Sequence, residues 1–374
     1  MISYLVDLYN GRISAQKNFF RYLSYVLYFP HVTQGPIARY EEVGYQLWEE
    51  HSFNMDTIMR GVWLMLWGFV KKIVIADRIG AFTKEIFGHT FDYHGGIFLA
   101  VGIAYSIQIY CDFSGCMDIV RGTSECFGIV LGENFRRPYF SQTLPEFWRR
   151  WHLSLGAFFR EYVFYPVSTS KLFLKLNVKI RDHLGKVFAA SIPILCVWVL
   201  TGLWHGAKWN YIAWGLYHGV LICMSTLFEE PLAKLTKALR IKTDCISWEI
   251  FRMLRTFILC VIGRLIFMGQ GIRSSIWMIR SMVFDHSKVY NIVDEFSLSG
   301  REWRVLIFGC LLLLAVSIAQ EIMERRGSTG DVREWLAKQN IVFKWLVMAA
   351  GLAFIAICGV YGSGAGASFI YEQF

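Results

Sequence analysis

Apolar stretches recur along the whole chain and predict its architecture. Seven of them approach the roughly 20 apolar residues that a helix needs to cross the hydrocarbon core of a bilayer. They are residues 57–76, 96–111, 187–204, 209–228, 250–269, 303–320 and 342–360. Shorter apolar pieces, expected to lie at the interface or to re-enter the membrane, are 17–30, 118–131, 157–168 and 275–285. The pattern predicts an all-α, polytopic integral membrane protein, with residues 1–374 forming a single membrane domain.

Polar residues interrupt the second apolar stretch. Gln108, Asp112 and Asp118 recur near the helical spacing and would share one polar face. A carboxylate in such a place must face water, a partner cation or a cavity, so Asp112 is a candidate cavity-lining residue. Asp118 can pair with Arg121 at i+3. The alternative is a helix end that emerges among the lipid headgroups.

A further helix is predicted after the second stretch. Thr143 and Glu146 have the spacing of a capping box, and a proline stands in the first turn. Glu146 can pair with Arg149 or Arg150. The residues that would share one side of this helix are Trp148, Trp151, His152 and Leu155. Such a helix is expected to lie in the interface or to dip into the protein.

Composition agrees with a membrane location. The chain is 55% hydrophobic and 18% charged, whereas a soluble protein carries about 25% charged residues. Its net charge of +9 is concentrated in residues 136–186, with ten Lys or Arg and three Asp or Glu. Basic loops beside spans mark the cytoplasmic side and bind anionic headgroups. We therefore expect membrane lipid, and no nucleic acid, as a partner.

Other charged and cysteine patterns are less specific. Lys71-Lys72, followed by Asp77-Arg78, looks like the charged stop of a span at the interface. The nine cysteines include no Cys-x-x-Cys pair, so neither a disulfide framework nor a zinc ribbon is predicted.

His205 lies in the most apolar part of the chain. No charged residue occurs between residues 187 and 203. An ionisable ring at that depth is costly unless it faces a polar cavity or a partner, which makes it a functional-site candidate. The glycines and tryptophans around it suggest close backbone approach around a cavity; they are Gly202, Gly206, Trp204 and Trp209.

The residues leave several alternatives open. Covalent catalysis would need Cys111, Ser114 or Ser154, and only Ser154 has a histidine nearby. A zinc site would need His152, His205 and His218 to converge, although no His-x-x-x-His pair is present. His218, thirteen residues after His205, would lie well apart from it on one continuous helix and is expected to pack or to form a hydrogen bond. A transporter would depend on Asp112, and an inactive scaffold would tolerate loss of either histidine.

Seven groups of motifs, in this order, carry a resemblance to a known family. They are Phe29-Pro30 with Gln34-Gly35-Pro36-Ile37, Lys71-Lys72 with Ala76-Asp77-Arg78, Tyr110-Cys-Asp112-Phe-Ser114-Gly115, Asn134-Phe-Arg-Arg-Pro-Tyr139, Phe147-Trp148-Arg149-Arg150-Trp151-His152-Leu-Ser154-Leu155, Leu203-Trp204-His205-Gly206 with Trp214-Gly215-Leu-Tyr217-His218-Gly219, and Phe369-Ile-Tyr371. The pattern resembles the membrane-bound O-acyltransferase family, and within it the bacterial branch typified by alginate O-acetyltransferase.

The resemblance implies a ring of tilted helices around a thin membrane centre, pierced by a tunnel in which a cytoplasmic donor and an external acceptor meet. It implies His205 as the catalytic residue and His152 as the second member of the site. Substrate-binding roles are expected for Trp151, Trp204, Asp112, Ser114, Arg149 and Arg150. Family members carry several spans before the string that starts here at Tyr4, so the chain is expected to lack that leading portion.

For acyl transfer, neutral His205 is expected to take the proton of an acceptor hydroxyl. His152 or a backbone N–H near Gly206 is expected to stabilise the oxyanion. Arg149 and Arg150 would hold the phosphates of a thioester donor, acetyl-CoA or an acyl carrier. No bound cofactor or metal is expected. The expected function is O-acetylation of a surface polysaccharide such as alginate, at a bacterial plasma membrane, with an extracytoplasmic partner protein. D-alanyl transfer to teichoic acid, or a transporter or flippase, is the alternative.

Overall fold

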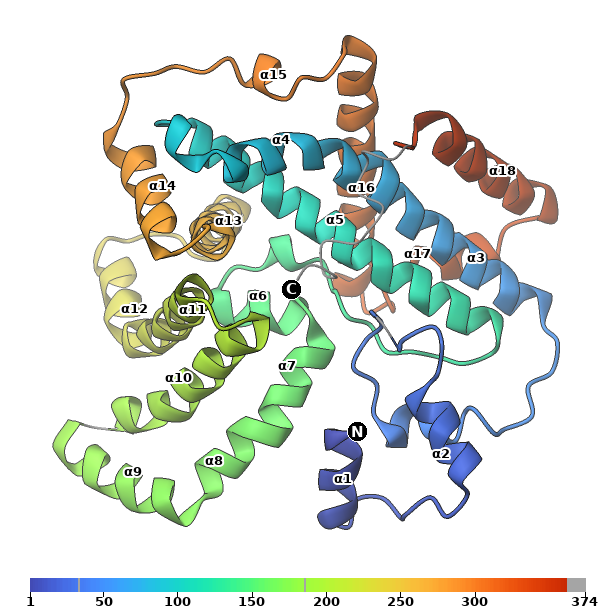
Figure 1. Ribbon diagram of the computed structural model, residues 1–374, viewed down its shortest axis with the longest axis horizontal. Coiled ribbons are helices and arrows are strands. Elements are labelled where there is room, and N and C mark those ends of the chain that lie inside the picture. Colours follow the sequence, from blue (N-terminus) through green and yellow to red (C-terminus); the bar gives the residue numbers. More distant parts are fainter. Residues whose placement is uncertain (33, 185, 362–374) are drawn as a thin grey trace. The chain divides into compact units, whose positions relative to one another are not determined.

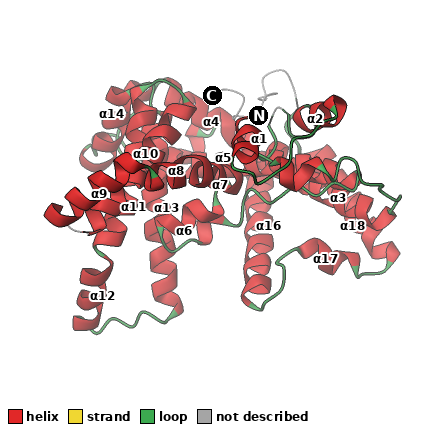
Figure 2. Cartoon of the chain, turned by 90° about the horizontal axis from the view of Figure 1, so that it is seen from below, coloured by secondary structure: helices red, strands yellow, loops and turns green. Residues whose placement is uncertain are grey.

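The computed structural model describes residues 1–32, 34–184 and 186–361 (Figure 1). In this part of the chain every regular element is a helix, and no strand is present (Figure 2). The all-α prediction is therefore confirmed. The motif Phe369-Ile-Tyr371 lies outside the described residues.

The chain divides into two compact units, and each is described by itself. Unit 1 comprises Met1–Lys84, Ala104–Asn134 and Asn291–Phe374, and unit 2 comprises Glu85–Ile103 and Phe135–Tyr290. The prediction of one membrane domain stays a prediction.

Unit 1 is built mainly from long helices. Its elements are α1 (Ile2–Tyr9), α2 (Phe19–Val26), a π-helical turn η1 (Tyr40–Gly44), α3 (Met55–Phe69), a π-helical segment η2 (Val70–Ala76), most of α4 (Asp77–Gly88) and α5 (Ile97–Cys126), α15 (Ile292–Glu295), α16 (Gly300–Arg325), α17 (Val332–Ala337) and α18 (Ile341–Cys358).

Unit 2 contains the segment in which both candidate histidines occur. Its elements are η3 (Thr90–Asp92), η4 (Pro138–Phe140), α6 (Leu144–Arg150), α7 (Leu153–Phe159), η5 (Arg160–Phe164), α8 (Tyr165–Thr169), α9 (Lys171–Leu184), α10 (Lys186–His205), α11 (Trp209–Leu227), α12 (Glu229–Ala238), α13 (Ile246–Met268) and α14 (Ile272–Phe284).

All seven predicted apolar stretches lie on helices, but they differ as membrane spans. By length and composition, α5, α16 and α18 could each cross a bilayer among the described residues. The helices α11 and α12 satisfy the same criterion together, with a bend of 55° between them. The other three stretches, 57–76, 187–204 and 250–269, form α3 with η2, α10 and α13 respectively. These helices are shorter or more highly charged.

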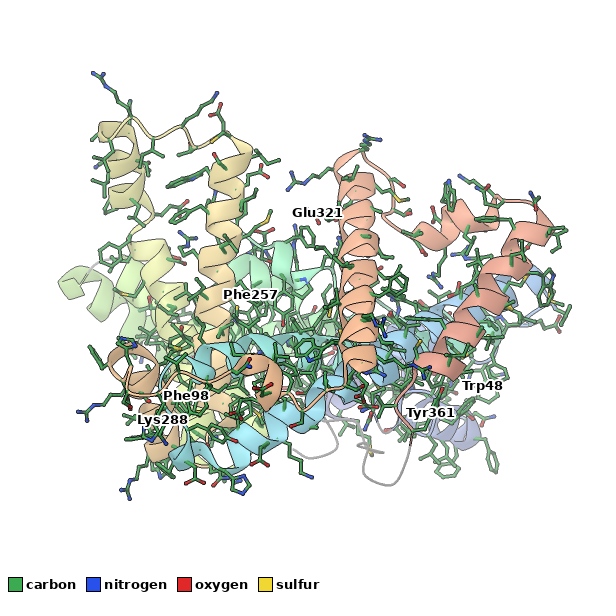
Figure 3. The ribbon with its side chains drawn as sticks, turned by 90° about the horizontal axis from the view of Figure 1, so that it is seen from above. Trp48, Phe98, Phe257, Lys288, Glu321 and Tyr361 are labelled. Atoms are coloured by element: carbon green, nitrogen blue, oxygen red, sulfur yellow. The ribbon has the colours of Figure 1, made fainter. Side chains whose placement is uncertain are left out.

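The three long apolar helices differ in burial. The apolar window of α5 is 72% buried, whereas those of α16 and α18 are only 17% and 6% buried. Side chains project from α16 along its length, with Glu321 near its C-terminal end (Figure 3). Soluble monomers rarely expose apolar faces of this extent, and such faces are typical of helices in contact with lipid.

Glycines let α3 and η2 pack directly on α5. A Cβ at Gly68 would lie 2.6 Å from the carbonyl oxygen of Gly115, and one at Gly61 would overlap the carbonyl oxygen of Gly122. The two glycine pairs are seven residues apart on each chain segment, as antiparallel helices in contact require. Small residues permit this close approach, which stabilises helix pairs in lipid.

The close approach brings two lysines to carboxylates. Lys72 Nζ lies 2.7 Å from Asp112 Oδ1 and 2.9 Å from Asp77 Oδ1. Lys71 Nζ lies 2.6 Å from Asp118 Oδ2. Both lysines are buried, so the prediction that Lys71-Lys72 is a charged stop at the interface is wrong. The reason is that the facing helix supplies a carboxylate for each lysine.

Asp112 was expected to face water, a partner cation or a cavity, and the structure shows the partner cation. Its side chain is buried in the middle of α5 and paired with Lys72, so the alternative of a helix end among headgroups is wrong. Asp118 also lies 3.9 Å from Arg121, as predicted, although Lys71 is its closer partner.

We predict that Lys72→Met destabilises the protein by about 3–5 kcal/mol, because it leaves two buried carboxylates without their cation. Denaturation of the purified protein in detergent, followed by tryptophan fluorescence, measures the loss. The control is Lys344→Met. Lys344 Nζ lies 3.6 Å from Asp56 Oδ1, and the Asp56 side chain is 76% exposed. Loss of this exposed pair should cost about 0–1 kcal/mol. Equal losses in the two variants would contradict the account of buried pairing.

Candidate active site

Two helices of unit 2, α10 and α11, form a tight antiparallel hairpin that ends α10 at His205. A Cβ at Gly202 would overlap the carbonyl oxygen of Tyr211, and one at Gly215 would overlap that of Trp198. Gly206 follows with a φ of 143°, which side-chain-bearing residues rarely adopt. The predicted close backbone approach around His205 is therefore confirmed, and Figure 1 shows α11 between α10 and α13.

Aromatic rings surround the imidazole of His205. Its ring centroid lies 4.7 Å from Trp204, 5.2 Å from Trp214 and 5.0 Å from Phe267, each with an edge-to-face orientation. These partners come from α10, α11 and α13 respectively. Edge-to-face packing fixes the orientation of an imidazole in a largely apolar environment.

His218 lies against the same tryptophan as His205. Its ring centroid is 5.2 Å from that of Trp214, and Trp148 Nε1 donates a long hydrogen bond of 3.4 Å to its Nδ1. The predicted role of His218 in packing or hydrogen bonding is confirmed. The separation expected on one continuous helix does not apply, because the chain reverses between the two histidines and both rings contact Trp214.

The helix predicted to start after Thr143 begins as expected but is too short. The Thr143 side chain accepts a hydrogen bond from the Glu146 backbone N–H at 3.2 Å, and Arg150 lies 2.8 Å from the Glu146 carboxylate. However, α6 ends at Arg150, so the continuous helical face from Trp148 to Leu155 is wrong.

Tertiary pairing accounts for this break. Trp151 is extended and forms a single antiparallel bridge with Phe135, while the Arg136 N–H donates to the Arg150 carbonyl at 2.9 Å. His152 then takes the left-handed conformation, with φ 51° and ψ 57°, and α7 begins at the next residue. A non-glycine residue held in this region costs about 1–3 kcal/mol and persists only where its surroundings impose it.

The break turns Trp151 and His152 into the interior, where both are buried. The His152 ring lies 6.3 Å from Trp204, the same ring that packs on His205 at 4.7 Å. Trp204 thus connects the two histidines that the sequence singled out. Burial, with a smaller effect of His205, lowers the pKa of His152 to about 3, so its imidazole is neutral at physiological pH.

The other predicted substrate-binding residues are placed differently. Arg149 is exposed on α6, and Arg150 of the same helix is paired with Glu146. Asp112 and Ser114 belong to unit 1, where Lys72 and Lys71 donate hydrogen bonds to them at 2.7 and 2.9 Å. Their roles in substrate binding stay predictions. Among the described residues, no three His, Cys, Asp or Glu side chains are grouped so as to share a metal ion.

Three residues near the histidines were not predicted. Trp214 and Phe267 complete the aromatic surroundings of His205, and Arg264 is buried on α13 with its guanidinium carbon 4.4 Å from the Trp151 ring. Arg264 carried a usable signal, since a charged residue inside a predicted span is a functional-site candidate. Trp214 stands in one of the motifs that carry the family resemblance, although that motif does not indicate a ring beside His205. Phe267 had no signal, because apolar stretches of this chain contain many such rings.

Comparisons with known proteins identify the family of the chain. Residues 12–271, which include both histidines, match the model of MBOAT, the membrane-bound O-acyltransferase family. The chain is 30% identical to the probable alginate O-acetylase AlgI of Pseudomonas aeruginosa over 85% of its own length and 56% of that protein. It is 27% identical to the peptidoglycan O-acetyltransferase of Helicobacter pylori, over 71% of its own length and 47% of that protein.

A third relative is the teichoic acid D-alanyltransferase of Bacillus subtilis, 28% identical over 61% of this chain and 57% of that protein. The chain thus spans roughly half to three-fifths of the length of these curated relatives.

We predict that the buried His152 makes stability fall with acid. The unfolded chain binds the proton near pH 6.5 and the folded chain only near pH 3, so its contribution is complete above pH 6.5 and is lost as the pH falls toward 3. From pH 7 to pH 5 this amounts to about 2 kcal/mol. His152→Asn does not titrate, and asparagine tolerates the left-handed backbone.

The measurement is the free energy of unfolding at pH 7 and pH 5 for the wild type and His152→Asn. The wild type should lose about 2 kcal/mol more than the variant. An identical pH dependence in both proteins would show that His152 is not buried in its neutral form.

Proposed function

Because the chain belongs to the membrane-bound O-acyltransferase family, we propose that it transfers an acyl group from a thioester donor to a hydroxyl acceptor at His205. The observation that supports this most is the edge-to-face packing of His205 against Trp204, Trp214 and Phe267, with the His152 ring 6.3 Å from the same Trp204. A base held in a fixed orientation among aromatic rings is suited to proton transfer.

In the proposed reaction, neutral His205 accepts the proton of the acceptor hydroxyl as the oxygen attacks the thioester carbonyl. A C–O bond forms, the C–S bond breaks, and the thiolate leaves and takes the proton from the imidazolium. Proton transfer by a positioned side chain contributes about 10²- to 10⁴-fold to rate. The N–H of His152, neutral at working pH, donates to the carbonyl oxygen as negative charge develops on it.

The names of the relatives support a choice of substrate class. They mention alginate, peptidoglycan and teichoic acid as acceptors, and acetyl and D-alanyl as the groups transferred. We assign acetyl transfer to a bacterial cell-surface polysaccharide, with alginate as the first acceptor to test and D-alanyl transfer to teichoic acid as the second. Acetyl-CoA or an acyl carrier is the donor, and Arg149 and Arg150 contact its phosphates.

The cellular setting belongs to the same proposal. The protein crosses the plasma membrane several times, and its tilted helices form the ring and tunnel of the family. Its exposed apolar helices contact lipid, and an extracytoplasmic protein works with it. A transporter would need an intramembrane carboxylate available to substrate, whereas Asp112 is paired with Lys72 at 2.7 Å.

We predict that His205→Gln lowers O-acetyl content of the surface polysaccharide at least about 100-fold, since glutamine fills the ring-walled site but cannot accept the proton. The readout is O-acetyl content of polysaccharide from cells that express the protein at matched membrane abundance. The control, His286→Gln, makes the same change at an exposed histidine and should leave acetylation unchanged.

Unchanged acetylation in His205→Gln would overturn the role of His205 and favour a transporter or a scaffold. Asp112→Asn separates these two, because only a transporter that uses the carboxylate would fail with folded protein in the membrane.

A further inference from the structure

Arg264 lies on α13, the helix that packs against His218 and His205. Its neighbours along α13 contact the histidines: a Cβ at Gly263 would lie 2.6 Å from His218 Nε2, and Phe267 packs on His205 at 5.0 Å. Arg264 follows Gly263 directly and precedes Phe267 by three residues, so it leaves α13 near the positions that contact His218 and His205, and it is only 6% exposed.

The guanidinium of Arg264 contacts an aromatic ring but pairs with no carboxylate among the described residues. Its central carbon lies 4.4 Å from the ring centroid of Trp151, a cation–π contact. Both Nε and Nη2 are buried and have no hydrogen-bond partner among the described residues. No carboxylate in this part of the chain is paired with it. This differs from unit 1, where the buried Lys71 and Lys72 each have an aspartate.

A buried cation without a counter-ion is destabilising, so its presence needs a compensating role. The two unpartnered nitrogens provide a specific chemical signature. Nε and Nη2 lie on the same edge of a guanidinium group, and their N–H bonds are nearly parallel. That edge matches two oxygen atoms of a single carboxylate or phosphate.

We propose that Arg264 binds an oxyanion group of a substrate in the site around His205. This proposal rests on the acyl transfer proposed above. The Trp151 ring contacts the guanidinium, and the Nε–Nη2 edge receives the two oxygens. Two substrates carry such a group: an acidic sugar of the acceptor through its carboxylate, or the thioester donor through its phosphate. Arg264 is thus a binding residue that positions one substrate.

The test is equilibrium binding to the purified full-length protein in lipid nanodiscs, which needs no turnover. The donor probes are acetyl-CoA and S-acetylpantetheine, which lacks the phosphates. The acceptor probes are an oligouronate and its carboxyl-reduced counterpart. The variants are Arg264→Met and Arg264→Lys. The control is Arg255→Met on the same helix, where the guanidinium is exposed and donates to the Gln142 carbonyl at 2.8 Å.

We expect Arg264→Met to weaken binding of one anionic probe at least about tenfold and to leave its uncharged counterpart unchanged. Loss of acetyl-CoA binding identifies the donor as the source of the oxyanion, and loss of oligouronate binding identifies the acceptor. Arg264→Lys should recover only part of the affinity, because an ammonium group lacks the paired donors. Arg255→Met should bind as the wild type does.

The melting temperature provides a second readout. Removing a buried cation that has no counter-ion should leave the melting temperature of Arg264→Met equal to or above that of the wild type. A lower melting temperature with unchanged probe binding would show that Arg264 only supports Trp151, and would overturn the inference. Wild-type protein that binds neither anionic probe more tightly than its uncharged counterpart would overturn it as well. Binding that depends on Arg264 without any acyl transfer would instead count against the proposed function alone.

Discussion

Close helix packing at glycine is the constraint on which both units depend. In unit 1, Gly68 and Gly115 let the backbones of α3 and α5 meet. In unit 2, Gly202 and Gly215 do the same for α10 and α11. Without a hydrophobic force between helices in lipid, such contacts supply much of the energy of association. Because backbones are in contact, the side chains beside the glycines are held at short range, and those side chains include the charged and ionisable groups.

The buried charged and ionisable side chains have different partners in the two units. In unit 1 each buried lysine faces an aspartate, an arrangement that stabilises the packing of η2 on α5. In unit 2 the ionisable groups are histidines surrounded by rings and one arginine stacked on Trp151. Within the described part of the chain, Arg264 has two buried donors without a hydrogen-bond partner, which suits the proposed reaction site better than a purely structural role.

Much of this could be predicted from the sequence, where local signals dominate. The apolar stretches located the helices, and Thr143 located the start of α6. The signals failed where tertiary contacts decide the backbone. The bridge from Phe135 ends α6 at Arg150 and sets the left-handed His152, and no local pattern reveals that pairing. Lys71-Lys72 resembled an interfacial stop because their partners on α5, Asp118 and Asp112, lie 47 and 40 residues further along the chain.

The site shows the same division. His205 and His152 stood out as ionisable residues in apolar or motif contexts, but their common contact with Trp204 depends on the hairpin and on the break after Arg150. Phe267, in an apolar stretch, could not be distinguished from a core residue, and the motif around Trp214 did not indicate its contact with His205. The most direct test of His205 as the base is acceptor-dependent thiol release from acetyl-CoA by the full-length protein in nanodiscs, with donor binding measured on the same sample. The account predicts that His205→Gln binds the donor as the wild type does but releases no thiol when acceptor is added. Release at the wild-type rate would contradict it.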